Sequence, residues 1–217
     1  MSFGLSRGRE LNIEGYGIRA ADLPPHDDGR VDPRTWFDVQ DNRFELEIGS
    51  GKGTFLVQQA VLEPKTNFLG IEWAGEFFRY AADRARRHAL ANVRVLHADA
   101  NEFIKLWCME GVAGVIHLYF SDPWPKKRHH KRRVIQDESL VLMHRLLRPS
   151  GELRLVTDHE ALWSWYEQHA ERQSELFERR AFTPPESAAD NEVVGTNFER
   201  KFAREGRPFY AMTLVRR

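Results

Sequence analysis

Short runs of β-favouring residues alternate with longer helical stretches from residue 44 onward, and this alternation most restricts what the chain can fold into. Successive strands separated by helices need crossover connections, which are typical of a mostly parallel sheet. Apolar residues in the helical stretches recur every three or four positions, as in Phe78, Ala81 and Ala85, and so mark a buried face. We therefore predict an α/β fold. Strands are expected at 44–48, 67–73, 93–98, 114–120, 152–157 and 208–215, and helices at 54–63, 75–89, 101–108, 136–147, 160–173 and 196–206.

A glycine-rich turn, EIGSGKG, follows the first of these strands and contains Gly49, Gly51 and Gly53. Glycines let the backbone turn sharply and approach a ligand closely at the carboxyl end of a strand, where open α/β sheets bind their ligands. Such turns also occur only to pack a helix on a strand, so the turn alone is a weak signal. An acidic residue, Glu47, lies two positions before the first glycine.

Acidic residues also follow the next three predicted strands, as Glu72, Asp99 and Asp122. Parallel strands end at one edge of the sheet, so these acids and the glycine turn are expected on a common rim. An acid about 20 residues beyond the glycines suits a ribose diol, as in NAD-binding proteins. The dinucleotide pattern, however, requires Gly or Ala where this turn has Thr54. A ligand with a ribose, an adenine amine and a cationic amino-acid end fits the acids better, and S-adenosylmethionine has all three.

The segment SDPWPKKRHHKRR at 121–133 follows the apolar run GVIHLYF and places an acid, Asp122, and a Pro-Trp-Pro corner before a dense cationic cluster. Lys and Arg clusters bind phosphates, although many are only solvated faces or localisation signals. A surface signal does not need an acid, a tryptophan and two prolines emerging from a buried strand. We therefore interpret this segment as a functional surface for a polyanion. Its basic residues are Lys126, Lys127, Arg128, His129, His130, Lys131, Arg132 and Arg133.

The composition limits the other possibilities. Lys plus Arg equals Asp plus Glu at 32 each, so nucleic-acid binding must rest on uneven charge distribution. Cys108 is the only cysteine, which excludes an internal disulfide, and no His/Cys spacing resembles a zinc site. The sequence shows no leader and no apolar run near 18 residues. A cytoplasmic protein without membrane or metal partners is expected.

The strings ELEIGSGKG, GIEW, HADA, FSDPWPKKRHHKRR, VTDH and TNFERKF occur in this order, and with them the chain resembles the bacterial tRNA (guanine-N7-)-methyltransferases. The resemblance runs from about residue 44 to 215. It implies a class I methyltransferase fold, with helices on both faces of a seven-stranded sheet whose last strand is antiparallel. It also implies S-adenosylmethionine as cofactor and tRNA as partner, with methylation of the variable-loop guanine at tRNA position 46.

Matching the family motifs residue by residue implies roles for individual positions. Asp122 takes the active-site role. The implied cofactor contacts are Glu47, Gly49, Gly51, Glu72, Asp99 and Asp122. The implied tRNA contacts are Lys126, Arg128, His129, His130, Lys131, Arg132, Arg133, Asp158, Thr196, Asn197, Phe198 and Glu199.

The domain division follows from the same pattern. Residues 1–43 lack sustained periodicity and are expected to form a partly irregular arm, and 44–217 the methyltransferase domain. Residues 183–195, TPPESAADNEVVG, are expected to be a mobile loop. The protein is expected to act as a monomer or a weak homodimer.

Guanine N7 carries an in-plane lone pair and no proton, so it can attack a sulfonium methyl group without a general base. We expect Asp122 to position and stabilise rather than deprotonate, by holding the ammonium group of the cofactor and favouring the positive charge that develops on the purine ring. Guanine also offers two donors, N1–H and the 2-amino group, which a carboxylate of Asp158 or Glu199 could accept. The alternatives are a helix N-cap for Asp158 and a solvated helix face for Glu199.

The tryptophans and the paired histidines also leave alternatives open. Trp124 either stacks on a base or buttresses its turn, and His129 and His130 are either phosphate contacts or spacers. Trp163, Trp165 and Tyr166 are interpreted as packing residues.

Two further functions remain open at this point. An adenine amino-methyltransferase uses an acid-or-amide, Pro, Pro, aromatic loop, which SDPW matches only in part because the second proline is missing. A non-catalytic RNA-binding domain of the same fold would not need an acid at every cofactor position.

Overall fold

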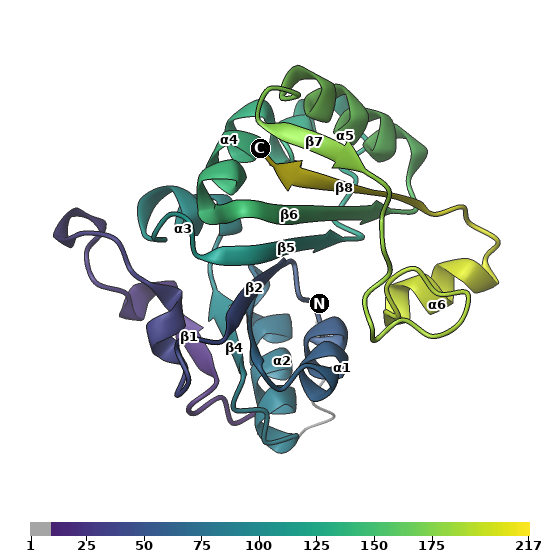
Figure 1. The fold of residues 1–217 in the computed structure, drawn as a ribbon. Helices are drawn as coiled ribbons and strands as arrows, with labels where there is room; N and C mark the ends of the chain where they lie inside the picture. Colours follow the sequence, from purple (N-terminus) through teal and green to yellow (C-terminus); the bar gives the residue numbers. More distant parts are fainter. Residues whose placement is uncertain (1–9) are drawn as a thin grey trace. The chain divides into compact units, whose positions relative to one another are not determined.

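The computed structural model describes residues 10–217, which divide after Met109 into two compact units. Residues 1–9 of the predicted arm lie outside the described residues. Each unit contains four strands and three α-helices (Figure 1). The predicted α/β class is confirmed.

The first unit is built on a parallel sheet in the order β1-β4-β3-β2. The strands are β1 (Gly17–Arg19), β2 (Arg43–Ile48), β3 (Thr66–Ile71) and β4 (Val93–His97). Glu47 pairs with Gly70 and Ile48 with Ile71, so β2 and β3 end side by side. The turns that follow both strands therefore meet at one edge of this sheet.

Helices α1 (Thr54–Leu62), α2 (Gly75–Arg87) and α3 (Ala100–Leu106) follow β2, β3 and β4 along the chain. Leu56 of α1 and Phe78 of α2 pack with Phe68 and Val95 of the sheet in one buried cluster. The helices begin and end close to their predicted limits. In α2 the buried residues Phe78, Ala81, Ala82 and Ala85 repeat at helical spacing and face the sheet.

Residues 10–43 belong to this first unit and are only partly irregular. β1 extends the sheet by three residues, from Gly17 opposite Val95 to Arg19 opposite His97. The guanidinium of Arg94 lies 5.6 Å from the centroid of the Tyr16 ring and 5.2 Å from that of Phe37. This arginine joins two parts of the N-terminal segment to β4.

The second unit has a mixed sheet in the order β5-β6-β8-β7 (Figure 1). β5 (Ala113–Tyr119) and β6 (Leu147–Thr157) are parallel, and β8 (Tyr210–Arg216) runs antiparallel to β6, as predicted for the last strand. β7 (Phe177–Arg180) was not predicted, because its sequence FERR contains a single apolar residue, the buried Phe177, and so shows no alternation. The resemblance implied a sheet of seven strands, and β1 of the first unit is the eighth.

Helices α4 (Asp137–Leu146) and α5 (Glu160–Arg172) pack on each other and on β6. α6 (Asn197–Arg204) ends before Gly206, whose φ of 69° closes the helix as the sequence predicted. β6 begins five residues earlier than expected, because the 147–151 segment joins the strand through a register shift opposite Ala113 and Val115. Within residues 10–217, no helix has the length and apolarity needed to cross a bilayer.

Candidate functional site

The glycine turn after β2 lies against the end of β3. Gly49, Gly51 and Gly53 all have left-handed φ values, of 78°, 52° and 64°, a backbone conformation that side-chain-bearing residues rarely adopt. The backbone N–H groups of Gly49 and Ser50 donate to the carbonyl of Ile71. A Cβ on Gly70 would lie 2.3 Å from Ser50 Oγ, so the absence of a side chain there permits this close approach.

Glu72 holds the same turn from the end of β3. Its Oε2 accepts a hydrogen bond from Gly51 N at 2.8 Å, and its Oε1 accepts one from Ala74 N at 2.8 Å. Glu72 therefore braces the turn.

Glu47 is the most unusual acid of this edge. The residue is 5% exposed, and its Oε2 has no hydrogen-bond partner among residues 10–217. Burial, followed by the nearby charge of Glu72, raises the pKa of Glu47 to about 8, although Ser50 opposes the shift. A buried carboxyl with an unpaired oxygen is costly, and a cationic donor would offset that cost.

Glu45 differs from Glu47, although strand alternation puts both on one face of β2. Glu45 Oε1 lies 2.9 Å from Arg43 Nε in an ion pair. Of these two acids, Glu47 is therefore the one with a buried oxygen that lacks a hydrogen-bond partner among residues 10–217.

Asp99 and Trp73 follow the ends of β4 and β3 at the same edge. Asp99 is exposed and caps α3, with its Oδ1 accepting from Glu102 N at 3.0 Å. Trp73 directly follows Glu72 and is 71% exposed, while its carbonyl contacts His97 Nε2 at 3.0 Å. Trp73 was not identified as a candidate site residue from the sequence. The signal that could have identified it is its position directly after Glu72, a predicted cofactor contact.

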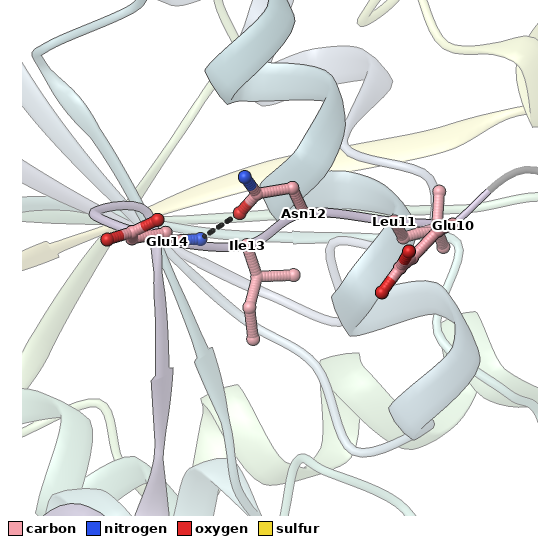
Figure 2. A pocket seen from close by; sticks show the side chains of 5 residues that line it. All are labelled: Glu10, Leu11, Asn12, Ile13 and Glu14. Carbon is pink, nitrogen blue, oxygen red and sulfur yellow. Dashed lines mark hydrogen bonds between the residues drawn. The ribbon is translucent and has the colours of Figure 1, made fainter.

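A shallow depression elsewhere in the first unit is lined by five consecutive residues, Glu10 to Glu14 (Figure 2). Its one internal hydrogen bond runs from Glu14 N to Asn12 Oδ1 at 2.8 Å. None of the predicted site residues lines it, so it is not a candidate for the predicted chemistry.

In the second unit, Asp122 lies on a firmly held segment that follows β5. Phe120 has a φ of 52°, and its ring contacts Phe202 and Phe209 with centroid distances of 5.9 and 5.7 Å. Ser121 Oγ is 2.8 Å from the hydroxyl oxygen of the buried Tyr166. Asp122 itself is exposed. An exposed carboxylate on a fixed backbone can act on a ligand without reorganisation of the segment.

The basic segment that follows includes a 3₁₀ turn, Lys127–Arg132. Lys126, Lys127, Arg128, Lys131 and Arg132 are exposed. The Arg132 guanidinium lies 4.9 Å from the centroid of the Trp124 ring. The Trp124 and His129 rings meet edge to face at 5.8 Å. Trp124 is thus engaged within its own segment, which agrees with the buttress interpretation.

Arg133 corrects one prediction, because it is 3% exposed and cannot belong to a docking surface in this structure. Its Nε donates to the Pro123 carbonyl at 2.9 Å, and its guanidinium lies 4.8 Å from the centroid of the Trp165 ring. The ring of His130 contacts Trp165 as well. Arg133 closes the loop from Pro123 back to α5. Trp165 and Tyr166 are packing residues, as expected.

We expect Arg133→Ala to lower the free energy of unfolding by about 1–3 kcal/mol, because it removes a buried hydrogen bond and the stacked guanidinium. The exposed Arg128→Ala, which also removes one positive charge, is expected to change stability by less than about 0.5 kcal/mol. Urea unfolding of both variants measures the difference. Equal stabilities would contradict the assigned role of Arg133.

Asp158 directly follows β6 and is paired with Arg207. Its Oδ2 accepts from Arg207 Nη1 at 2.7 Å, and its side chain is 12% exposed. The N-cap of α5 is His159, and no side chain caps it. The N-cap alternative for Asp158 is therefore wrong. Arg207 was missed because its partner lies 49 residues away in the sequence.

Four consecutive predicted RNA contacts at the start of α6 separate into two pairs. Asn197 and Phe198 are exposed, whereas Thr196 and Glu199 are 7% and 2% exposed. Thr196 Oγ1 accepts from Glu199 N at 3.1 Å. The Glu199 carboxylate accepts from the backbone N–H groups of 193–195, including Gly195 N at 2.8 Å.

The buried pair corrects two predictions. Glu199 lies neither on a solvated helix face nor where it could read a base, because its oxygens organise the end of the 183–195 loop. Thr196 caps α6. Among residues 10–217, no group of three or more His, Cys, Asp or Glu side chains is placed to hold a metal ion.

Known proteins match the chain over most of its length. A family model described as "Putative methyltransferase" matches residues 41–212. The tRNA (guanine-N(7)-)-methyltransferase of Geobacillus kaustophilus is 34% identical over 81% of this chain and 80% of its own. The protein of the same name from Alkaliphilus oremlandii is 34% identical, covering 81% and 82%.

Solved structures share the fold. The crystal structure of the 16S rRNA methyltransferase KamB has a TM-score of 0.57 and 19% identity, covering 84% of this chain and 89% of its own. That of the aminoglycoside resistance methyltransferase NpmB1 has a TM-score of 0.55 and 20% identity, covering 81% and 87%. At these identities the similarity shows the fold alone.

Proposed function

Because the chain belongs to the family of tRNA (guanine-N(7)-)-methyltransferases, we propose that it transfers a methyl group from S-adenosylmethionine to N7 of a guanine in tRNA. The proposed target is the variable-loop guanine at tRNA position 46. One observation of the structure carries the proposal furthest: the buried Glu47 carboxyl, with its unpaired oxygen, lies beside a glycine turn at the ends of parallel strands.

The residues of the first unit fit the cofactor chemically. Glu47 can accept from the ammonium group of the amino-acid end, which would satisfy its unpaired Oε2. The turn containing Gly49 and Gly51 permits close backbone approach, and Glu72 and Asp99 supply acceptors for hydroxyl and amine donors. By motif matching, Asp122 is also a proposed contact. S-adenosylmethionine supplies an electrophilic methyl group on a sulfonium.

Methyl transfer to guanine N7 does not require the protein to remove a proton from the base. Guanine N7 has a lone pair and no hydrogen, so Asp122 is proposed to position the reactants and to stabilise positive charge that develops on the purine. Alignment of this kind supplies several kcal/mol of catalysis. The firm attachment of its segment through Phe120 and Ser121 supports this role.

The exposed cations of the 126–132 segment are the proposed contacts for tRNA phosphates, and His129 and His130 are half-buried beside them. Asp158 is the proposed acceptor for the pairing edge of the target guanine. Asn197 and Phe198 remain proposed RNA contacts at the exposed start of α6. Specific recognition of a single-stranded base by such groups requires that the base be splayed from its stack.

Replacing Lys126, Arg128 and Lys131 together with Ala should flatten the salt dependence of tRNA binding. Each phosphate contact contributes roughly 0.7–0.9 to the slope of log affinity against log salt, so the slope should fall by about 2–3. Binding titrations between about 50 and 200 mM salt measure it. A control that replaces the exposed Lys65, Arg148 and Arg217 removes the same charge elsewhere. Equal slopes for the two variants would show that the basic residues of 126–132 do not contact tRNA phosphates and form only a solvated surface.

The activity is tested by incubating the protein with unmodified tRNA and methyl-labelled cofactor, then digesting the RNA to nucleosides. The proposal predicts labelled N7-methylguanosine. Labelled N6-methyladenosine would instead identify an adenine amino-methyltransferase. RNA binding with no methyl transfer would indicate a non-catalytic RNA-binding domain.

A further inference from the structure

Arg207 lies between the end of α6 and the start of β8, and three groups fix its guanidinium. Nη1 donates to Asp158 Oδ2 at 2.7 Å, and Nη2 lies 2.7 Å from Glu205 Oε2. The guanidinium carbon is 4.3 Å from the centroid of the Phe202 ring. A planar, forked cation can meet two carboxylates and a ring face together, which an ammonium cannot.

The ion pair with Arg207 restricts the orientation of the Asp158 carboxylate but does not occupy all of its hydrogen-bond acceptor positions. A carboxylate has about four acceptor positions, and one Arg N–H occupies one of them. Rotation of the carboxyl group is limited, because turning it would break a 2.7 Å charged hydrogen bond. Asp158 therefore has a set orientation and retains capacity for two further donors, the number that the guanine pairing edge presents.

Arg207 also contacts the segment of α6 that supports the other proposed active-site loop. The Phe202 ring beneath the guanidinium packs against Phe120, two residues before Asp122. A single side chain thus touches Asp158 directly and the support of the Asp122 segment through Phe202.

We propose that Arg207 is a positioning residue for recognition of the target guanine. It holds Asp158 so that the carboxylate accepts from N1–H and the 2-amino group. This inference rests on the proposed function, in which Asp158 contacts the RNA. Arg207 itself takes no part in methyl transfer.

The test compares two tRNA transcripts, with guanosine or inosine at the methylated position, because inosine keeps N7 and N1–H but lacks the 2-amino group. The wild-type protein should prefer guanosine by about 10–100-fold in kcat/KM. Arg207→Ala should lose most of this preference, and Arg207→Lys should recover only part of it. The control Arg204→Ala removes an exposed cation three positions away and should keep the preference.

Two further measurements separate positioning from a structural role. Affinity for S-adenosylmethionine and a single cooperative unfolding transition should be retained in Arg207→Ala, because this side chain is 44% exposed. Adding Arg207→Ala to Asp158→Ala should cost no further preference, since the arginine acts through the carboxylate. Additive losses would overturn the inference.

The proposed function and this inference fail in different ways. If wild type shows no preference for guanosine over inosine, or if Asp158→Ala keeps the full preference, Asp158 does not read the base. The proposed contact of Asp158 and the inference on Arg207 then both fall, whereas methyl transfer to N7 is tested separately by the nucleoside analysis. If Asp158→Ala loses the preference but Arg207→Ala keeps it, only the inference on Arg207 is refuted. Equal losses in Arg207→Ala and Arg204→Ala would also refute it, in favour of a general charge effect.

Discussion

Asp122→Ala is expected to lower the rate of methyl transfer at saturating cofactor and tRNA by about 10²–10³-fold, the usual cost of removing one group that stabilises developing charge. Folding should be retained, because Asp122 is exposed and its segment is held by Ser121, Phe120 and Arg133. Single-turnover kinetics with labelled cofactor measures the effect.

The controls for this variant separate charge from position. Asp122→Asn keeps the shape and removes the charge, so it should lose most of the same rate. Asp41→Ala removes another exposed acid and should transfer methyl groups normally. A rate for Asp122→Ala within about threefold of wild type would contradict the active-site role.

Glu47→Gln is expected to weaken S-adenosylmethionine binding by about 100-fold, or about 2.7 kcal/mol, because a buried carboxylate can no longer pair with the cofactor ammonium. The same substitution should stabilise the cofactor-free protein near pH 8 by about 1–2 kcal/mol, since it removes a buried, unpaired acid. Calorimetric titration and thermal unfolding give the two results. Glu47→Gln is thus expected to weaken cofactor binding while raising the stability of the cofactor-free protein.

Glu45→Gln is the matched control on the same strand. Glu45 is paired with Arg43, so its substitution should lower stability and leave cofactor affinity nearly unchanged. If Glu45→Gln weakened binding more than Glu47→Gln, the assignment of the ligand acid would be reversed.

The pH dependence follows from the raised pKa of Glu47, about 8 in the folded protein against an ordinary 4.5. Between these values the folded state holds a proton that the unfolded state has lost. The stability contributed by Glu47 is therefore full below about pH 4.5 and is lost as pH rises to about 8. Cofactor affinity should rise over pH 6–8 as the carboxyl ionises. Both dependences should be absent in Glu47→Gln.

Regular periodicity made most of the fold predictable from sequence. The helix at 160–173 was predicted within one residue, because its buried residues Leu162, Tyr166, His169 and Ala170 repeat at helical spacing. β7 was not predicted, since an exposed edge strand with the sequence FERR has no apolar alternation to reveal it. The strand β1 was missed for a similar reason: three residues carry too short a pattern.

The acids of the candidate site were predictable because each follows a strand, but their local partners were not. The ion pair that occupies Glu45 and the unpaired oxygen of Glu47 depend on side-chain geometry within one strand. Arg133 belongs to a run of exposed cations in sequence, yet it turns inward to Trp165 across 32 residues. The sequence pattern does not show such contacts between residues that are distant along the chain, so these partners could not be predicted.

The most direct test of the central claim, methylation at guanine N7, is the replacement of the target guanosine in a tRNA transcript by 7-deazaguanosine. This analogue keeps the N1–H and 2-amino donors but has a carbon in place of N7. We predict binding comparable to that of the normal transcript, with no methyl transfer. Transfer to the 7-deaza transcript at the normal rate would contradict the proposed reaction.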